Sequence, residues 1–343
     1  MNITNTVGTW LPEIVQGPLT SSWIVRWCAA QENWDKIHYD LEYARNVAKL
    51  PHTVVNGALK QHLAAQYLLD IFGTDAWIWR LKCRFQGMDH VGHRLRFRGR
   101  VAGEERCDDG VLVHVDIRVL NLERAATTTE VRATIVLSGS GRPVLDALSL
   151  YGERSHLAHI DSVVDDGVPA SVSQRLGGTI DQIVSCCPVE LGRLRLFSDA
   201  ISNRHTIYYD AVAGIASPHG CVVAPPLFPI HAISEPPGAR ELSGDPNALG
   251  REGVCEVGRN LAPMFGLPPQ GLLNGANEAQ IHSLARVGET VKATSRLAAA
   301  RCRRGKNGGL MVILDTVNEY DTTTRRPLLT ERQSTIFRIE AGT

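Results

Sequence analysis

The sequence lacks the features that would tie it to nucleic acid or to a membrane. Its 36 Lys and Arg residues balance 36 Asp and Glu residues, so the formal net charge is zero. A balanced chain has no overall field to hold it on nucleic acid or on an anionic membrane. No apolar run approaches the roughly 18 residues that a membrane-spanning helix needs. The first residues show no basic segment followed by an apolar core. We therefore expect a cytoplasmic protein without nucleic-acid or membrane partners.

Cysteine spacing excludes a zinc-ribbon site. None of the 8 cysteines forms a C-x-x-C pair, and Cys186 and Cys187 are adjacent. No His, Asp or Glu cluster has metal-ligand spacing, and the glycines match neither a P-loop nor a dinucleotide fingerprint. The sequence predicts reduced thiols, no metal and no cofactor.

What is present is a length of 343 residues and a hydrophobic share of 43%, which suit two globular domains. In the first half, a helical run of apolar residues at spacings of four extends from Ala58 to about Phe72. Strand-like segments with period-two alternation follow at 77–85, 92–101, 111–119 and 131–137. A long helix followed by four strands with one polar face indicates an α+β domain with an antiparallel sheet.

The same order of segments returns in the second half. The segment Asn33–Asp40 (NWDKIHYD) matches Asn203–Asp210 (NRHTIYYD), and Val54–Leu59 (VVNGAL) matches Val222–Leu227 (VVAPPL). The matching blocks lie 170 and 168 residues further along, which indicates a duplication. Strand-like segments close the second half at 277–285, 289–300, 310–320 and 334–339. The predicted organisation is a first domain at 1–145, a linker at 146–178, a second domain at 179–343 and an insertion near 234–270.

These blocks resemble the MaoC-like hydratase/dehydratase family, and in particular its 3-hydroxyacyl-thioester dehydratase branch. That branch carries a motif like N-x-H-R-I-H-Y-D and then a V-V-H-G-P-L segment that opens the central helix. The resemblance implies a double hot-dog fold, with two antiparallel sheets each wrapped around a long central helix. The second half resembles the family's non-catalytic partner domain through its segments at 197–201, 207–210 and 223–227.

The sequence departs from the family pattern at several positions. The catalytic half usually comes second, whereas here it comes first. Asp35 stands at the first His of the branch motif, and Asn56 stands at the His before the helix glycine. Asn33 stands where the wider R-specific hydratases carry Asp.

The resemblance implies a reaction at the acyl thioester. His38 is the expected general acid/base, because an imidazole titrates near neutral pH. The opening turn of the helix at Gly57 is the expected oxyanion hole, since its first N–H groups lack internal partners and glycine allows close approach. Alternatives remain open: His38 could simply bond a backbone carbonyl, and Asn56-Gly57 could be an ordinary cap.

Further residues are assigned to the same site. Asn33 can hold a water molecule or orient His38, but it cannot accept a proton. Asp35 would raise the pKa of a nearby His38 and is expected to replace part of the missing acidic function, unless it is a solvated loop carboxylate. The expected substrate-binding residues are Asn56, Gly57, Ala58, Tyr39, Tyr208 and Asn203.

The second half is expected to lack a catalytic site. Tyr208 stands where the first half has His38, and tyrosine is a poor base because its pKa is near 10. Pro225 and Pro226 remove backbone donors. Following the family, this half would widen a tunnel for the acyl chain. Asn203 and His205 are weaker candidates for a role in the site.

Two basic clusters have ordinary interpretations. Arg301, Arg303, Arg304 and Lys306 could meet the phosphates of coenzyme A or a phosphopantetheine carrier, but a solvated hairpin tip is favoured. The residues Arg94, Arg96, Arg98 and Arg100 fit an exposed sheet face.

The leading prediction is a hydro-lyase, an enoyl-thioester hydratase or 3-hydroxyacyl-thioester dehydratase. One alternative is a scaffold recruited for a cyclisation or rearrangement in biosynthesis, and another is a non-catalytic acyl-binding subunit. The expected ligand is an acyl thioester of coenzyme A or of an acyl carrier protein. Assembly into a homodimer is left open.

Overall fold

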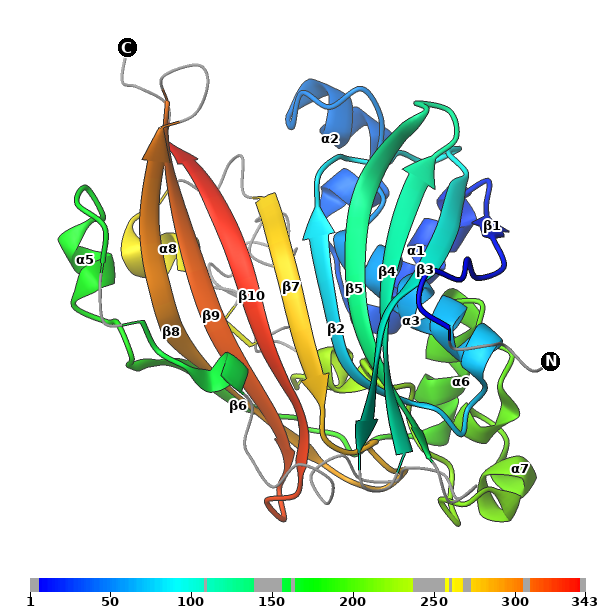
Figure 1. Ribbon diagram of the computed structural model, residues 1–343. Helices are drawn as coiled ribbons and strands as arrows, with labels where there is room; N and C mark the ends of the chain where they lie inside the picture. The colour runs from blue at the N-terminus through cyan, green and yellow to red at the C-terminus, as the bar shows by residue number, and fades with distance from the viewer. Residues whose placement is uncertain are drawn as a thin grey trace.

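The protein is built on one antiparallel sheet of ten strands. The computed structural model describes residues 6–107, 110–138, 156–161, 164–236, 257–258, 261–267, 273–304 and 309–339. The strand order is β1-β3-β4-β5-β2-β7-β10-β9-β8-β6, so each half of the chain supplies five neighbouring strands (Figure 1). Strands β2 and β7 pair at the centre and join the halves. The predicted double hot-dog architecture is confirmed, with its two sheets merged into one.

The first half contains four helical segments and five strands. Its elements are β1 (Ile14–Gln16), α1 (Ser21–Gln31), η1 (Lys36–His38), α2 (Leu41–Asn46), α3 (Gly57–Phe72), β2 (Trp77–Phe85), β3 (Leu95–Cys107), β4 (Gly110–Asn121) and β5 (Ala126–Ser138). All four predicted strands are present. Strand β4 shows why, because Val113, Val115 and Ile117 are buried while Asp116 and Arg118 between and beside them are exposed.

The second half repeats this order with shorter helices. Its described elements are η2 (His156–Ala158), α5 (Ala170–Ser173), β6 (Thr179–Val184), α6 (Leu191–Ala200), η3 (Thr206–Tyr208), α7 (Ala211–Ala216), η4 (Phe228–His231), α8 (Leu261–Phe265), β7 (Leu273–Ile281), β8 (Val291–Arg304), β9 (Leu310–Thr322) and β10 (Pro327–Ile339). The predicted closing strands are present, although β10 begins seven residues earlier than expected. The short edge strands β1 and β6 were not predicted.

A second long central helix is missing from the described part of the chain. Where α3 stands in the first half, the second half has the four-residue helix η4. The double hot-dog fold stands, and among the described residues α3 is its one long central helix. A helix that began at Pro226 would need the N–H of Pro229 for its first i→i−4 hydrogen bond, and proline supplies none. Residues 237–256 of the predicted insertion lie outside the described residues.

Helix α3 is buried on all sides rather than along one stripe. Eleven consecutive residues, Leu59–Leu69, are buried. The first half covers one side, and the second half covers the other through α6, η4 and β7. Figure 1 places α3 behind the strands of the first half, near α1 and α6. The burial of α3 fixes the position of its first turn, where the candidate site lies.

Matching hydrogen bonds in the two halves support the duplication. The backbone N–H of Asn33 donates to the Cys28 carbonyl at 2.8 Å, and the backbone N–H of Asn203 donates to the Ser198 carbonyl at 2.8 Å. Isolated bridges join Val54 to His90 and Val223 to Arg286. Val54 therefore corresponds to Val223, which moves the predicted alignment of that block by one residue.

Candidate active site

The loop that carries the predicted catalytic residues is held by its own polar side chains. Glu32 adopts the left-handed conformation (φ 54°) and ends α1. The Asn33 Oδ1 atom then accepts the Asp35 amide at 3.0 Å. Asp35 Oδ1 accepts the Ile37 amide at 3.2 Å and so caps η1. This sequence of short-range bonds explains why a polar loop is rigid enough to aim His38.

His38 is buried, and its ring is oriented by two contacts from the segment before α3. Its Nδ1 lies 2.8 Å from the Val54 carbonyl oxygen, and its Nε2 lies 3.2 Å from Asn56 Nδ2. A carbonyl can only accept, so Nδ1 carries the proton, and in the neutral ring Nε2 presents a lone pair. The predicted alternative, a histidine that bonds a backbone carbonyl, is thus also present. It fixes the tautomer and leaves Nε2 as the basic atom.

Asn56 links His38 to the start of α3. Its Oδ1 accepts the Ala58 amide at 2.7 Å as the N-cap of the helix, while its Nδ2 meets His38 Nε2. The orientation of this amide follows from its two neighbours, because a backbone N–H needs an acceptor and an imidazole lone pair needs a donor. Asn56 is thus the helix cap that the sequence allowed for, and it also contacts the candidate base, while its expected role in substrate binding stays a prediction.

Burial dominates the titration of His38. Desolvation lowers its pKa below the ordinary 6.5, while the bond to Val54 and the negative charge of Asp35 act in the opposite direction. The predicted influence of Asp35 has the right sign, but it is not the largest effect. The His38 imidazole is therefore neutral at neutral pH and available as a base.

Gly57 opens α3 beside an aromatic ring. A Cβ added at Gly57 would stand 3.3 Å from two ring carbons of Phe85, so the missing side chain makes room for this ring. Among the described residues, no acceptor meets the Gly57 N–H. The first N–H of the helix is thus available to an oxygen near His38. The sequence did not point to Phe85 as part of this site.

The remaining first-half residues fill supporting positions. The Tyr39 hydroxyl donates to the Trp34 carbonyl at 3.0 Å, and Tyr209 makes the matching bond to Arg204 at 3.2 Å. Since both halves share this bond, it braces the loop. Ala58 is half-buried in the first turn of α3.

A buried ion pair anchors the other side of the same turn. Lys60 Nζ lies 2.8 Å from Asp89 Oδ2, and both side chains are almost fully buried. Asp89 also accepts hydrogen bonds from Asn121 at 2.7 Å and Thr128 at 2.8 Å. Such a satisfied network holds α3 against the sheet next to Gly57. No short-range sequence pattern brings these four residues together.

Tyr208 and Asn203 do not join His38. Tyr208 lines a small hollow together with Leu69 and Thr74, at the far end of α3. His205, in the same loop as Asn203, pairs with Asp70 at 3.1 Å. Thirteen residues separate Gly57 from Asp70 on this helix, which corresponds to about 20 Å. The second-half loop thus caps the opposite end of the helix from the candidate site. Burial raises the pKa of Tyr208, which makes it a still weaker base.

The basic clusters are largely neutralised. Arg301 pairs with Asp315 at 2.7 Å, and Arg303 pairs with Asp165 at 3.2 Å. Residues 305–308, including Lys306, lie outside the described residues. On β3, Arg98 pairs with Glu13 at 3.1 Å, and its guanidinium stacks on the exposed Trp10. These charges lie on exposed faces, as predicted.

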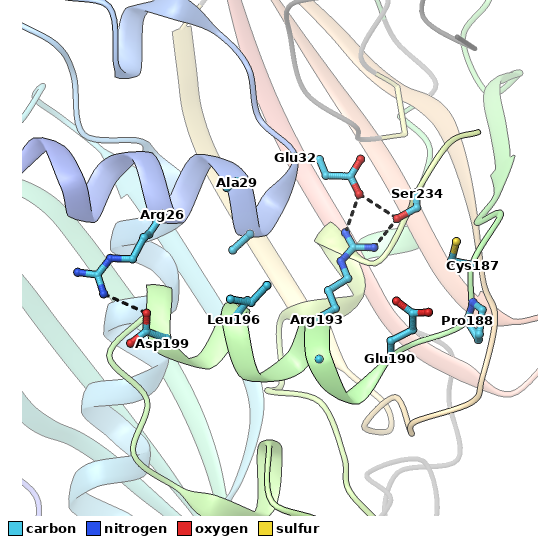
Figure 2. A pocket seen from close by; sticks show the side chains of 12 residues that line it. Arg26, Ala29, Glu32, Cys187, Pro188, Glu190, Arg193, Leu196, Asp199 and Ser234 are labelled. Atoms are coloured by element: carbon cyan, nitrogen blue, oxygen red, sulfur yellow. Dashed lines mark hydrogen bonds and ion pairs between the residues drawn. The ribbon is translucent and has the colours of Figure 1, made fainter. Parts of the chain in front are cut away.

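A groove of about 510 Å³ lies between α1 and α6. Figure 2 shows Arg193 pointing to Glu32 and Ser234 on one side of it, and Arg26 reaching Asp199 on the other. The groove borders the candidate loop at Glu32, but it does not include His38. Over the residues that can be described, no helix is long and apolar enough to cross a membrane, and no group of His, Cys, Asp or Glu could hold a metal ion. The six cysteines whose side chains are described are free thiols.

Taken together, the fold and the site define a double hot-dog protein with one imidazole aimed at the first turn of its central helix. Family models match both halves. Hydroxyacyl-thioester dehydratase type 2 matches residues 13–84, and the FAS1-like dehydratase domain region matches residues 182–330. A comparison with curated proteins found no match.

Solved structures of similar fold cover nearly the whole chain. A MaoC domain protein dehydratase from Chloroflexus aurantiacus aligns over 98% of this chain and 96% of its own, with 10% identity and a TM-score of 0.65. A MaoC-like dehydratase aligns over 97% and 98%, with 10% identity and a TM-score of 0.62. A Mycobacterium tuberculosis protein with a double hot-dog fold aligns over 97% of each chain, with 12% identity and a TM-score of 0.58. The chain therefore matches dehydratase family models in each half and shares the double hot-dog fold of these solved structures.

Proposed function

We propose that the protein is a cofactor-independent hydro-lyase that adds water to, or removes it from, the α,β-carbons of an acyl thioester. The observation that carries this proposal is the position of His38 Nε2, which faces Asn56 at the opening of α3. A base and the unpaired donors of a helix start are thus held together in a largely buried place.

In the hydration direction, His38 Nε2 takes a proton from water as the water oxygen bonds to the β-carbon. The electrons of the double bond move onto the thioester oxygen, and the Gly57 N–H stabilises the resulting enolate. The imidazolium then returns a proton to the α-carbon. Dehydration is the same sequence reversed. Neither direction changes an oxidation state, so the proposal includes no redox cofactor and no metal.

The neighbouring residues have supporting roles in this scheme. Asn56 Nδ2 holds Nε2 until a water molecule replaces it, and the charge of Asp35 favours the imidazolium that forms during turnover. Asn33 shapes the loop through its bond to the Asp35 amide. The thioester is one of coenzyme A or of a carrier protein, and the second half contributes room for the acyl chain.

One observation favours a second candidate, an acyl-binding protein without turnover. In the structure, His38 Nε2 is already bonded to Asn56, and Phe85 lies against Gly57. If this arrangement persisted with a ligand bound, the imidazole would hold the ligand without reacting.

The test is the hydration of crotonyl-coenzyme A, which is monitored through the loss of enoyl-thioester absorbance. His38→Ala should lower kcat/KM by about 100-fold or more, since general acid–base catalysis contributes at least that much. The matched control is Tyr208→Phe, at the corresponding place in the second half, which should retain activity. Unchanged turnover in His38→Ala would contradict the role of His38, and a parent protein that binds the thioester without turning it over would favour the binding protein.

A further inference from the structure

Gln31, the last residue of α1, has a fully buried side-chain amide that makes no hydrogen bond within the described residues. It has no exposed surface, and neither its Oε1 nor its Nε2 meets a partner within the described residues. It lies on the same helical face as the buried Trp27 and Cys28. A buried amide without partners is costly, so native proteins rarely keep one without a reason.

The fold itself does not require an amide at this place, because the duplication supplies an internal comparison. The bond from Asn33 to Cys28 corresponds to the bond from Asn203 to Ser198, an offset of 170 residues. By the same offset, Gln31 corresponds to Ile201, which is 2% exposed. The second half therefore fills the equivalent buried position with a hydrocarbon, and only the half that carries His38 has an amide there.

Gln31 also lies close to the candidate site along both helices. The Trp27 ring, one turn before Gln31, contacts the ring of His62 on α3 with centroids 5.1 Å apart. His62 is one turn after Ala58, the second residue of α3. Beyond Gln31, the chain passes directly into the loop that places His38 on Asn56. Both routes lead from Gln31 to the first turns of α3, where the thioester is proposed to bind.

We propose that Gln31 binds a hydroxyl group of the substrate, an inference that rests on the proposed acyl-thioester substrate. A carboxamide offers a donor and an acceptor side by side, and a hydroxyl oxygen can use both kinds of partner. Two sources supply this chemistry. One is the water that is added, which is also the 3-hydroxyl of the product, and the other is a hydroxyl further along the acyl chain.

The first test uses stability. Gln31→Ile, which installs the residue of the second half, should raise the melting temperature by a few degrees, because the unpaired amide is removed. The reciprocal variant Ile201→Gln should lower the melting temperature and leave kcat/KM unchanged. A lowered melting temperature for Gln31→Ile and for the isosteric Gln31→Met would mean that the amide serves the fold, and it would overturn the proposal.

The second test uses turnover with two enoyl thioesters, crotonyl-coenzyme A and its analogue with a hydroxyl on the terminal carbon. Gln31→Ile should lower kcat/KM about tenfold, the loss expected for one or two hydrogen bonds. An equal loss on both substrates identifies the reaction's own water, and a loss confined to the analogue identifies a chain hydroxyl. Unchanged kcat/KM on both would refute a role in binding.

A binding measurement separates this inference from the proposed reaction. The melting temperature of the parent protein should rise more with 3-hydroxybutyryl-coenzyme A than with butyryl-coenzyme A, and Gln31→Ile should abolish the difference. This difference can be present even if the parent protein has no hydratase activity. Equal shifts with both thioesters would exclude the 3-hydroxyl as the group bound. Equal shifts with 4-hydroxybutyryl- and butyryl-coenzyme A as well would contradict the inference, whatever the activity.

Discussion

At the scale of single residues, the chemistry depends on how the protonation of His38 is set. Burial lowers its pKa, whereas Asp35 and the Val54 carbonyl favour the charged ring. A general base with a lowered pKa stays neutral, and therefore active, as the solution becomes mildly acidic. The acid limb of the pH–rate profile for hydration should accordingly lie below the ordinary histidine pKa of 6.5.

Replacing Asp35 should move this limb in a definite direction. Asp35→Asn removes a negative charge that raises the pKa of His38, so the acid limb should shift to still lower pH. Asparagine can still cap η1 through its side-chain oxygen. The measurement is kcat/KM against pH for parent and variant. A limb that moves to higher pH would show that Asp35 does not act on His38 through its charge.

The sequence predicted residue types at the site better than their contacts. His38, Asn56 and Gly57 do meet at the start of α3, because their motifs are local and the loop bonds are short in sequence. The Phe85 ring beside Gly57 and the absence of hydrogen-bond partners around the Gln31 side-chain amide depend on long-range packing. No spacing rule could have revealed them.

At the scale of elements, α3 is the point where both halves meet, and aromatic rings form the contact. His62 on α3 packs against Trp27 of α1, Phe197 of α6 and His231 of η4, with ring centroids 5.1 Å apart in each pair. Burial lowers the pKa of His62 to about 3. Protonating His62 would place a charge in this contact.

Acid should therefore weaken the contact between the helices. In the unfolded chain His62 binds a proton below about pH 6.5, whereas in the folded protein it does so only near pH 3. The free energy of unfolding therefore decreases as the pH is lowered from about 6.5 to 3. At pH 5, the parent should lose about 2 kcal/mol from this group relative to pH 8. His62→Phe should lack this part of the loss. Urea unfolding at both pH values is the measurement, and an identical acid loss in the variant would contradict the assignment.

The burial of α3 also marks a limit of sequence patterns. The apolar residues at spacings of four from Ala58 to about Phe72 predicted a helix, and α3 occupies this segment. That spacing is typical of a helix with one buried face. The polar side chains Lys60, Gln61, His62 and Gln66 would be exposed on such a helix. Gln61 and His62 are buried against residues of the second half. Lys60 is instead buried against Asp89 of the first half, and Gln66 donates to Asp70 one turn along the helix.

At the scale of the whole molecule, a buried polar network joins the two halves. Gln61 on α3 donates to Asn277 on β7 at 2.9 Å, and Asn277 in turn bonds Glu331 on β10. Asn318 and Tyr320 on β9 also donate to the Glu331 carboxylate, at 2.9 Å and 3.2 Å. The first turns of α3 are thus tied to the second-half sheet.

The Glu331 carboxyl gives this junction a pH dependence of the opposite sign to that of His62. Burial raises its pKa above 4.5 despite the three donors, so the folded state holds the proton more tightly and loses stability as pH rises through the raised pKa. The stability of Glu331→Gln relative to the parent should therefore increase as the pH rises above 4.5. Urea unfolding of both proteins across this range is the measurement. A relative stability that falls with pH would mean that the three donors outweigh burial.

The overall architecture was predictable because the repeat and the strand alternation are written along the chain. The pairing of β2 with β7, which merges the two sheets, was not predictable, because the sequence of a strand does not show which other strand its edge will pair with. The missing second helix was not predictable from Pro225 and Pro226, because proline is tolerated in the first turn of a helix, where the N–H groups have no internal partners. Pro229 is the residue that removes the first i→i−4 hydrogen bond.

The most direct test of the catalytic role of His38 is the rate at which the parent protein and His38→Ala hydrate crotonyl-coenzyme A, with circular dichroism as the check on folding. We expect turnover by the parent and a loss of about 100-fold or more in a variant that remains folded. Equal rates for the two folded proteins would contradict it.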